Sequence, residues 1–303
     1  MTAGGPQTAV MITSPPFGRA LCAMITPFTE DGERLDLDAA GALAARLIAD
    51  GCDGLVLSGT TGESPTTSDA EKTALITAVR QAVGPDVPLI AGVGSADTRH
   101  TAGLARAAED AGADGLLVVT PYYSRPPQTA VETHFRRVAD AVGVPVMLYD
   151  IPGRTGTRIE VETVLRLAEH PRITAVKDCS GDLLGATRVI ARTGLAYYSG
   201  NEELNLPLYA VGGAGYVSTV ANVAPAALRA VLDAFDRGDT ARAARLNARV
   251  MELAERMMHG GLPGTVTAKA LLGAGPVREP LWSADAETTG ELRELYTALL
   301  NGV

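Results

Sequence analysis

The stretch "DGCDGLVLSG" (50–59) decides the fold, because "DAGADGLLVV" (110–119) repeats its organisation. Each stretch begins at the end of an alanine-rich helical pattern and passes through a Gly-x-Asp-Gly turn. Each then continues into a run of apolar residues, which is typical of a buried strand. The two stretches therefore predict two copies of one helix–turn–strand unit.

The same alternation continues along the chain. Apolar runs predict strands at 20–26, 54–58, 88–93, 115–119, 144–149, 173–177, 195–199 and 214–220. Between and after them, amphipathic patterns predict helices at 36–50, 69–83, 98–111, 128–142, 160–169, 182–193, 202–211 and 225–237. Strands that alternate with helices form parallel βαβ units, and eight such units favour an α/β fold closed into a (β/α)8 TIM barrel.

The two ends of the chain do not fit this rhythm. Residues 1–18 are small, polar and proline-bearing, which predicts a flexible N-terminal tail. The barrel is expected over 19–238, where Gly238 breaks the pattern. Residues 239–303 predict a C-terminal helical domain, with helices at 239–258, 264–273 and 287–300.

Composition excludes several classes of partner. The net charge is −9 and no basic run occurs, so we expect neither nucleic acid nor an anionic membrane surface as a partner. No apolar stretch is long enough to span a bilayer. The first basic residue is Arg19, so we expect no secretory signal with a positively charged start.

The cysteines and histidines show no ligand spacing. Cys22, Cys52 and Cys179 are odd in number and far apart, which predicts reduced thiols, a cytoplasmic protein and no metal site. We expect the four histidines at surface or helix-end positions: His100, His134, His170 and His259.

Lysine is rare in this chain, and one lysine ends a strand. Of 26 lysines and arginines only three are lysines: Lys72, Lys177 and Lys269. Lys72 is expected to be solvated on a helix, and Lys269 belongs to another helix. Lys177 closes "ITAVK" (173–177), where a buried ammonium is costly unless it is paired or neutral. Lys177 is therefore either a cation paired with Asp178 or a neutral amine nucleophile.

Polar segments follow the predicted strands, where TIM barrels carry their catalytic groups. These segments are "SGTTGES" (58–64), "TPYYSRPP" (120–127), "YDIPGRTG" (149–156) and "YYSGNEE" (197–203). In the first, glycines and threonines can form a backbone nest for a small carboxylate. The alternative is an ordinary turn in which Ser64 or Thr67 caps the next helix. In a barrel we favour the carboxylate site.

Two further side chains each have two interpretations. Tyr149 is either a core tyrosine bonded to backbone or a phenol that passes protons beside Lys177. Arg154 is either a surface cation or a planar fork for a second carboxylate. Taken together, the amine, the phenols, the hydroxyls and the arginine suit covalent Schiff-base chemistry on a keto acid.

The joint order of six motifs resembles a known family. The motifs are "TPF" (26–28), "GTTGES" (59–64), "TPYY" (120–123), "YDIPGRTG" (149–156), "VKD" (176–178) and "SGN" (199–201). From about Arg19 to its end, the chain resembles the pyruvate-dependent class I aldolase family of dihydrodipicolinate synthase and N-acetylneuraminate lyase. The "PYY" loop and the arginine of "PGRTG" favour the synthase branch.

The resemblance implies a role for each matching residue. Lys177 would form an imine with pyruvate, and no other cofactor would be needed. Thr60 and Thr61 would hold the pyruvate carboxylate with their backbone amides. Tyr149 would carry protons, and Thr60 would link it to Tyr123 of a neighbouring subunit.

The resemblance also implies a second substrate and an assembly. Arg154 would bind the carboxylate of L-aspartate-4-semialdehyde, and Gly200 and Val217 would line the pyruvate site. The product would be 4-hydroxy-tetrahydrodipicolinate, for lysine and diaminopimelate biosynthesis. The assembly would be a homotetramer, a dimer of dimers.

Some positions depart from the family pattern. Asp150 and Gly153 stand where asparagine and serine are frequent, and Asn201 replaces an aspartate near the aldehyde end of the site. Two alternatives follow. One is a sister pyruvate-dependent aldolase or lyase that acts on another aldehyde or a sugar acid. The other is a non-catalytic keto-acid sensor.

The resemblance also bears on feedback inhibition by lysine. Asp69 and Lys72 stand where inhibited members commonly carry histidines, Ala96 where they carry asparagine, and His100 where they carry glutamate. Because the glutamate would pair with the α-ammonium of the inhibitor, we expect little inhibition by L-lysine.

Overall fold

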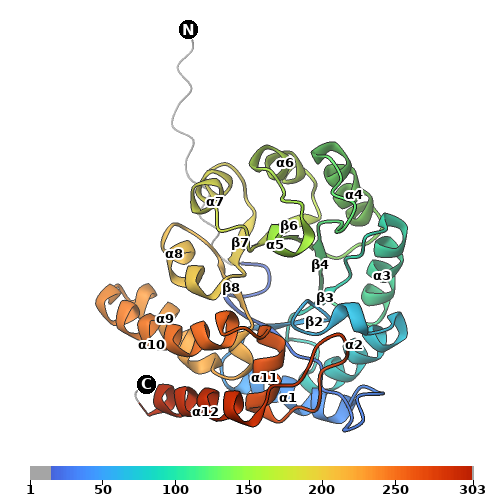
Figure 1. The fold of residues 1–303 in the computed structure, drawn as a ribbon. Helices are drawn as coiled ribbons and strands as arrows, with labels where there is room; N and C mark the ends of the chain where they lie inside the picture. The colour runs from blue at the N-terminus through green and yellow to red at the C-terminus, as the bar shows by residue number, and fades with distance from the viewer. Residues whose placement is uncertain (1–14, 302–303) are drawn as a thin grey trace.

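The computed structural model describes residues 15–301, which form a barrel of eight parallel strands wrapped by helices (Figure 1). The strands are β1 (Ala20–Ala23), β2 (Gly54–Leu57), β3 (Leu89–Gly92), β4 (Gly115–Val119), β5 (Val146–Asp150), β6 (Ile173–Asp178), β7 (Ala196–Ser199) and β8 (Gly215–Ser218). Each strand pairs with the next, and β8 closes on β1 with Leu21 opposite Val217. The predicted TIM barrel is confirmed.

The helices between the strands surround the barrel, and α10, α11 and α12, which follow it, lie together at its outer edge (Figure 1). The α-helices are α1 (Leu37–Ala49), α2 (Asp69–Val83), α3 (Thr98–Asp110), α4 (Gln128–Asp140), α5 (Pro152–Thr155), α6 (Val161–Leu167), α7 (Leu183–Ile190), α8 (Asn205–Ala210), α9 (Pro225–Asp236), α10 (Thr240–His259), α11 (Gly264–Leu272) and α12 (Ala286–Leu300). Short 3-10 helices are η1 (Ser64–Thr66), η2 (Glu202–Leu204) and η3 (Val220–Asn222).

The strands read as unbroken apolar runs because both of their faces are buried. In β1, Leu21 and Ala23 point into the barrel, whereas Ala20 and Cys22 belong to the layer between sheet and helices. Successive side chains of a strand alternate between faces, so both layers need apolar residues at every position. Polar residues are thereby confined to strand ends and loops.

The N-terminus of α2 shows whether the segment after β2 serves as the cap of this helix. Ser68 accepts a hydrogen bond from the amide of Glu71, whose carboxylate accepts one from the Ser68 amide, which is a capping box. Neither Ser64 nor Thr67, the two candidates for this cap, performs it. The "GTTGES" turn is therefore separate from the helix cap.

The predicted tail is too long at its C-terminal end. Phe17 is 2% exposed and belongs to the apolar cluster inside the barrel. Its ring occupies the space beside Gly115, where a Cβ would lie 2.6 Å from the ring carbons. Residues 1–14 of the predicted tail lie outside the described residues.

His134 corrects the expectation for the histidines. It is 2% exposed, and its Nδ1 lies 2.9 Å from the Thr98 hydroxyl. The reason is helical spacing: together with Val131, Phe135 and Val138 it forms the inward face of α4. Burial lowers the pKa of His134 to about 4, so the ring is neutral.

The three helices expected after the barrel are present, and α10 packs against α9 of the barrel. The division of the chain into a barrel and a C-terminal domain at residue 238 stays a prediction. Within residues 15–301 no helix combines the length and the apolar character that a membrane span requires.

Candidate active site

Lys177 and Tyr149 lie side by side at the C-terminal ends of β6 and β5. They are direct partners in the strand register, and the Lys177 Nζ lies 4.5 Å from the centre of the Tyr149 ring. Both are buried, with 6% and 4% of their surface exposed. Burial lowers the pKa of Lys177, and the nearby Arg154 charge acts in the same direction. A larger share of the amine is thus neutral and nucleophilic.

Asp178 does not pair with Lys177. Adjacent strand residues face opposite sides of a sheet, and the Asp178 carboxylate accepts hydrogen bonds from the Tyr197 hydroxyl at 2.9 Å and the Ser180 amide at 2.5 Å. Among the described residues no carboxylate lies within ion-pair distance of the Lys177 amine. The geometry therefore favours the amine interpretation of Lys177 over the paired cation.

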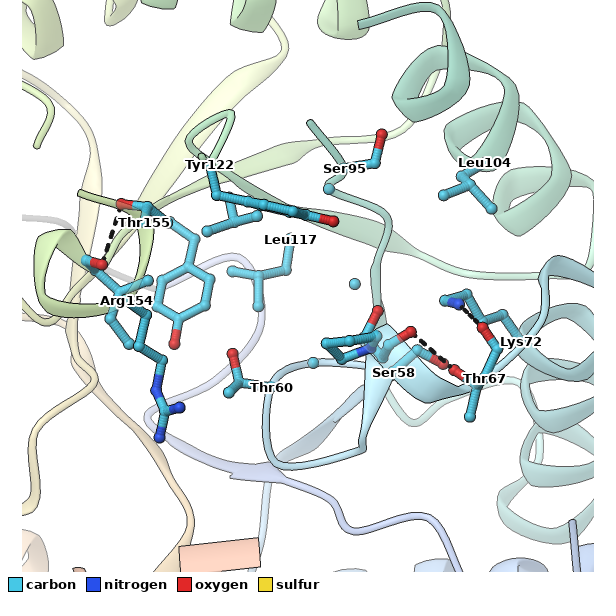
Figure 2. Close-up of a pocket in the computed structure, with 18 of the residues that line it drawn as sticks. Ser58, Thr60, Thr67, Lys72, Ser95, Leu104, Leu117, Tyr122, Arg154 and Thr155 are labelled. Carbon is cyan, nitrogen blue, oxygen red and sulfur yellow. Dashed lines mark hydrogen bonds between the residues drawn. The ribbon is translucent and has the colours of Figure 1, made fainter. Parts of the chain in front are cut away.

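Tyr149 is a protonated phenol in this site. Burial raises its pKa well above the ordinary value, while a hydrogen bond with Thr60 and the charge of Arg154 oppose the shift. Figure 2 shows Thr60, Tyr122 and Arg154 around one cavity, which Tyr149 also lines. A neutral phenol beside an amine can donate a proton and take it back.

The turn after β2 is folded tightly. The Glu63 amide donates to the Thr60 carbonyl at 3.1 Å, and the Ser64 amide donates to the Gly59 carbonyl at 3.2 Å. A Cβ at Gly62 would lie 3.1 Å from the carbonyl oxygen of Met24, the residue after β1, so a side chain here would force the backbone to shift by a few tenths of an ångström.

This turn leaves two amides available. Within residues 15–301, the amides of Thr60 and Thr61 donate to no other group of the chain. Two successive free N–H groups form a small anion nest, which fits the predicted carboxylate site. The Thr61 hydroxyl itself turns away and lies 2.9 Å from the Thr219 hydroxyl, just after β8.

Gly200 lies beside Lys177. A Cβ at Gly200 would lie 2.7 Å from the Lys177 Cε and 2.4 Å from the Cys179 Sγ. A side chain at this position, just after β7, would therefore displace Lys177 or Cys179. Val217 lies on β8 in the interior cluster that includes Tyr149.

Arg154 stands on the one-turn helix α5, exposed at the mouth of the cavity (Figure 2). The cavity measures about 420 Å³. Thr60, Tyr149 and Arg154 line one end of it, whereas Lys177, Thr61, Gly200 and Val217 do not line it.

The other end of the cavity lies between α2 and α3. It is lined by Ser64, Asp69, Lys72, Ser95, His100 and Tyr122. The expectation of a solvated Lys72 is wrong, because this lysine is half-buried and its amine donates to the Thr67 carbonyl. The Asp69 carboxylate lies 2.9 Å from the His100 Nε2.

Tyr123 is not part of the site within one chain. It is 94% exposed and has a φ of 73°. A link from Thr60 to Tyr123 would therefore need a second copy of the chain.

The structure adds residues that the sequence did not single out. Glu202 is 4% exposed and accepts hydrogen bonds from the amides of Thr219 and Val220 and from the Ser218 hydroxyl. It thereby fixes the turn after β8 on which Thr219 meets Thr61. Thr219 follows β8 directly, but the predicted strand 214–220 included it, so its place beyond a strand end was hidden in the sequence. Glu202 at a helix start is indistinguishable from an ordinary helix-end acid.

A TIM barrel with a buried amine beside a phenol at the ends of β6 and β5 defines a class: Schiff-base-forming lyases of the class I aldolase type. Within this class, residues 16–299 match the Dihydrodipicolinate synthetase family, and the chain belongs to that family. The predicted resemblance is confirmed.

Individual relatives are similar over almost their whole length. The chain is 71% identical over 291 residues to 4-hydroxy-tetrahydrodipicolinate synthase 1 of Streptomyces coelicolor, covering 94% of this chain and 95% of the relative. It is 54% identical to synthase 2 of that organism, covering 92% and 94%. The solved structure of DHDPS from Cyanidioschyzon merolae with lysine bound has a TM-score of 0.90 at 38% identity, covering 93% of this chain and 98% of that chain.

Proposed function

We propose that this chain condenses pyruvate with L-aspartate-4-semialdehyde through a Schiff base on Lys177. The product is 4-hydroxy-tetrahydrodipicolinate, an intermediate for lysine and diaminopimelate. The observation that carries the chemistry is the buried Lys177 amine, unpaired among the described residues and 4.5 Å from the Tyr149 ring centre. The identity of 71% to a synthase of this name supports the choice of substrates.

The reaction begins with the neutral Lys177 amine, which attacks the keto carbon of pyruvate. Tyr149 donates a proton to the departing oxygen, and loss of water leaves a protonated imine. The imine draws electrons from the methyl carbon, which loses a proton and becomes the enamine carbon. That carbon attacks the aldehyde, a carbon–carbon bond forms, and the new alkoxide takes up a proton. Attack by the amino group of the bound product on the imine releases Lys177.

Three groups orient the substrates for this sequence. The free amides of Thr60 and Thr61 hold the pyruvate carboxylate. Gly200 and Val217 shape the space around the imine. Arg154 at the mouth of the cavity binds the carboxylate of the aldehyde as a two-pronged donor.

Trapping the imine tests this proposal. Incubation with pyruvate and borohydride should leave one reduced pyruvate adduct per chain, mapped to Lys177 by peptide mass spectrometry. The Lys177→Met variant should form none, and Lys72 and Lys269 serve as internal controls. An adduct on either of these, or none at all in the natural chain, would refute the mechanism. Assays with a panel of aldehydes then separate the synthase from a sister aldolase.

We also propose a homotetramer, a dimer of dimers, located in the cytoplasm. The outward-facing Tyr123 supports association between chains. The three free thiols support a reducing compartment. The net charge of −9 supports small-molecule substrates in place of nucleic acid or a membrane surface.

A further inference from the structure

The C-terminal extension places a buried ion pair directly behind the "GTTGES" turn. Lys269 of α11 is 3% exposed, and its Nζ lies 2.5 Å from the Oε1 of Glu63. The same amine donates to the Pro276 carbonyl at 2.8 Å and lies 3.9 Å from the centre of the Phe28 ring. A buried ion pair gains little net stability, because desolvation offsets attraction. Its position suggests a role in placing the turn.

Glu63 is held at both carboxylate oxygens by the extension. The second oxygen accepts a hydrogen bond of 2.8 Å from the Arg278 amide. Glu63 also has a φ of 55°, a left-handed conformation that a residue with a side chain adopts at a cost. The ion pair therefore secures a backbone conformation that the turn alone does not favour.

That conformation sets the direction of the two free amides. The N–H and C=O of a trans peptide point in opposite directions. The Glu63 amide fixes the Thr60 carbonyl, so it also fixes the Thr61 N–H in the same peptide plane. In the preceding plane the Ser64 amide fixes the Gly59 carbonyl, and with it the Thr60 N–H.

A second residue of α11 reaches the same turn. The Thr265 hydroxyl donates to the Thr61 carbonyl at 3.2 Å. Thr265 and Lys269 are four residues apart, hence on one face of the helix. One face of α11 thus holds the turn on both sides of Gly62.

We propose that Lys269 and Thr265 are positioning residues that aim the amides of Thr60 and Thr61 at the pyruvate carboxylate. The inference rests on the proposed function, because it takes pyruvate as the ligand of this turn. It assigns the C-terminal extension a part in substrate binding in addition to its packing.

The helix offers a matched control. Thr267 lies on α11 between the two proposed residues and is fully buried, but its hydroxyl donates to the carbonyls of Met257 and Gly264, away from the turn. Thr265→Val and Thr267→Val each remove one buried hydroxyl. Both should lower the melting temperature by a similar amount. Only Thr265→Val should raise the KM for pyruvate, by about three- to tenfold, with kcat changed much less.

Two more variants keep the test decisive if Thr265→Val does not fold. Thr265→Ser retains the hydroxyl and should retain the KM for pyruvate. Glu63→Gln/Lys269→Met removes both charges together, which avoids leaving one ion buried alone, and should raise the KM for pyruvate without abolishing folding.

The outcomes separate this inference from the proposed function. If the natural chain forms no borohydride-trapped adduct with pyruvate, the proposed function fails. If it forms the adduct, but Thr265→Val and the double variant trap it at sub-saturating pyruvate as fast as Thr267→Val does, the positioning role is overturned and the function stands.

Discussion

Two of the three lysines are buried, and their surroundings give them opposite uses. Lys269 faces Glu63 at 2.5 Å and stays a structural cation. Lys177 faces the Tyr149 ring with no carboxylate of the described residues in ion-pair range. Burial lowers the pKa of both, and only in Lys269 is the shift opposed by a paired acid. A lysine side chain is therefore a structural cation at position 269 and a nucleophile at position 177.

Arg154 gives a test at the level of one side chain. Arg154→Ala should lower kcat/KM for the aldehyde by about ten- to a hundredfold, because a charge-assisted pair of about 1.5–3 kcal/mol is lost. Imine formation with pyruvate should change much less, as measured by borohydride trapping. Arg188→Ala is the control, since Arg188 pairs with Glu162 on the surface at 2.8 Å. Equal damage to both half-reactions would contradict the role.

The titration of Asp150 predicts how the stability of the protein depends on pH. This side chain is 5% exposed, and burial together with the neighbouring Asp178 raises its pKa from 3.8 to about 7. Between these values the folded state binds more protons than the unfolded state, so stability falls as pH rises from about 4 to about 7. The groups that oppose the shift are the Ile159 amide, which donates to Oδ1 at 3.1 Å, and the charge of Arg158.

Asp150→Asn should remove this dependence. Relative to the natural chain, the variant should gain stability from pH 4 to pH 7, at most on the order of 4 kcal/mol. Thermal unfolding of both proteins across that range measures the difference. Parallel curves for the two proteins would show that the carboxyl does not titrate as described.

At the scale of elements, α2 and α3 contribute three charged or titratable side chains to the second end of the cavity: Asp69, Lys72 and His100. Lys72 stands in its wall, and Asp69 of the first turn of α2 already lies 2.9 Å from the His100 Nε2 of α3. A dicationic amino acid would meet like charge at Lys72 and a carboxylate whose acceptor is engaged. L-lysine should therefore bind weakly there.

Titration of L-lysine at sub-saturating pyruvate should show little inhibition at millimolar concentration, and calorimetry on the same sample should show no saturable binding in the micromolar range. His100→Glu supplies a free carboxylate and should increase the response. Strong inhibition of the natural chain would mean that other contacts form the site.

Local sequence patterns were sufficient to predict most of the strands and helices and part of the candidate site. Strands are buried on both faces and helices on one face, so strands appear in the sequence as apolar runs and helices as amphipathic patterns. The eight alternations of strand and helix could therefore be predicted from the sequence. The polar groups at strand ends, Lys177, Tyr149 and Thr60, follow from the architecture of the barrel. His134 was misjudged because a polar residue on an apolar helix face carries no local mark of burial.

At the scale of the whole molecule, the unpredicted features are contacts between distant segments. The Lys269–Glu63 pair joins the C-terminal extension to the turn after β2, and the Phe17 ring meets Gly115 across the barrel. Neither contact has a sequence spacing that a helix or strand period would reveal. The position of Tyr123 is of the same kind, because its partner would be another chain.

Tyr123 tests whether the site is shared between chains. It is 94% exposed on a backbone with a φ of 73°, an arrangement that is costly unless a neighbour uses it. Tyr123→Phe removes only the hydroxyl. It should leave the mass of the assembly unchanged in light scattering and reduce kcat by about tenfold or more. Tyr296→Phe, on α12 and away from the cavity, should leave kcat unchanged.

Mixing one inactive and one impaired variant decides whether the phenol acts across an interface. Lys177→Met lacks the nucleophile, and Tyr123→Phe lacks the hydroxyl. If the hydroxyl comes from the partner, a mixed dimer contains one site with an intact Lys177 and an intact Tyr123 from the other chain. Random association after unfolding and refolding a one-to-one mixture should then restore roughly a quarter of the natural activity. If Tyr123 acts within its own chain, every site lacks one of the two groups, and the mixture shows no more than the residual activity of Tyr123→Phe.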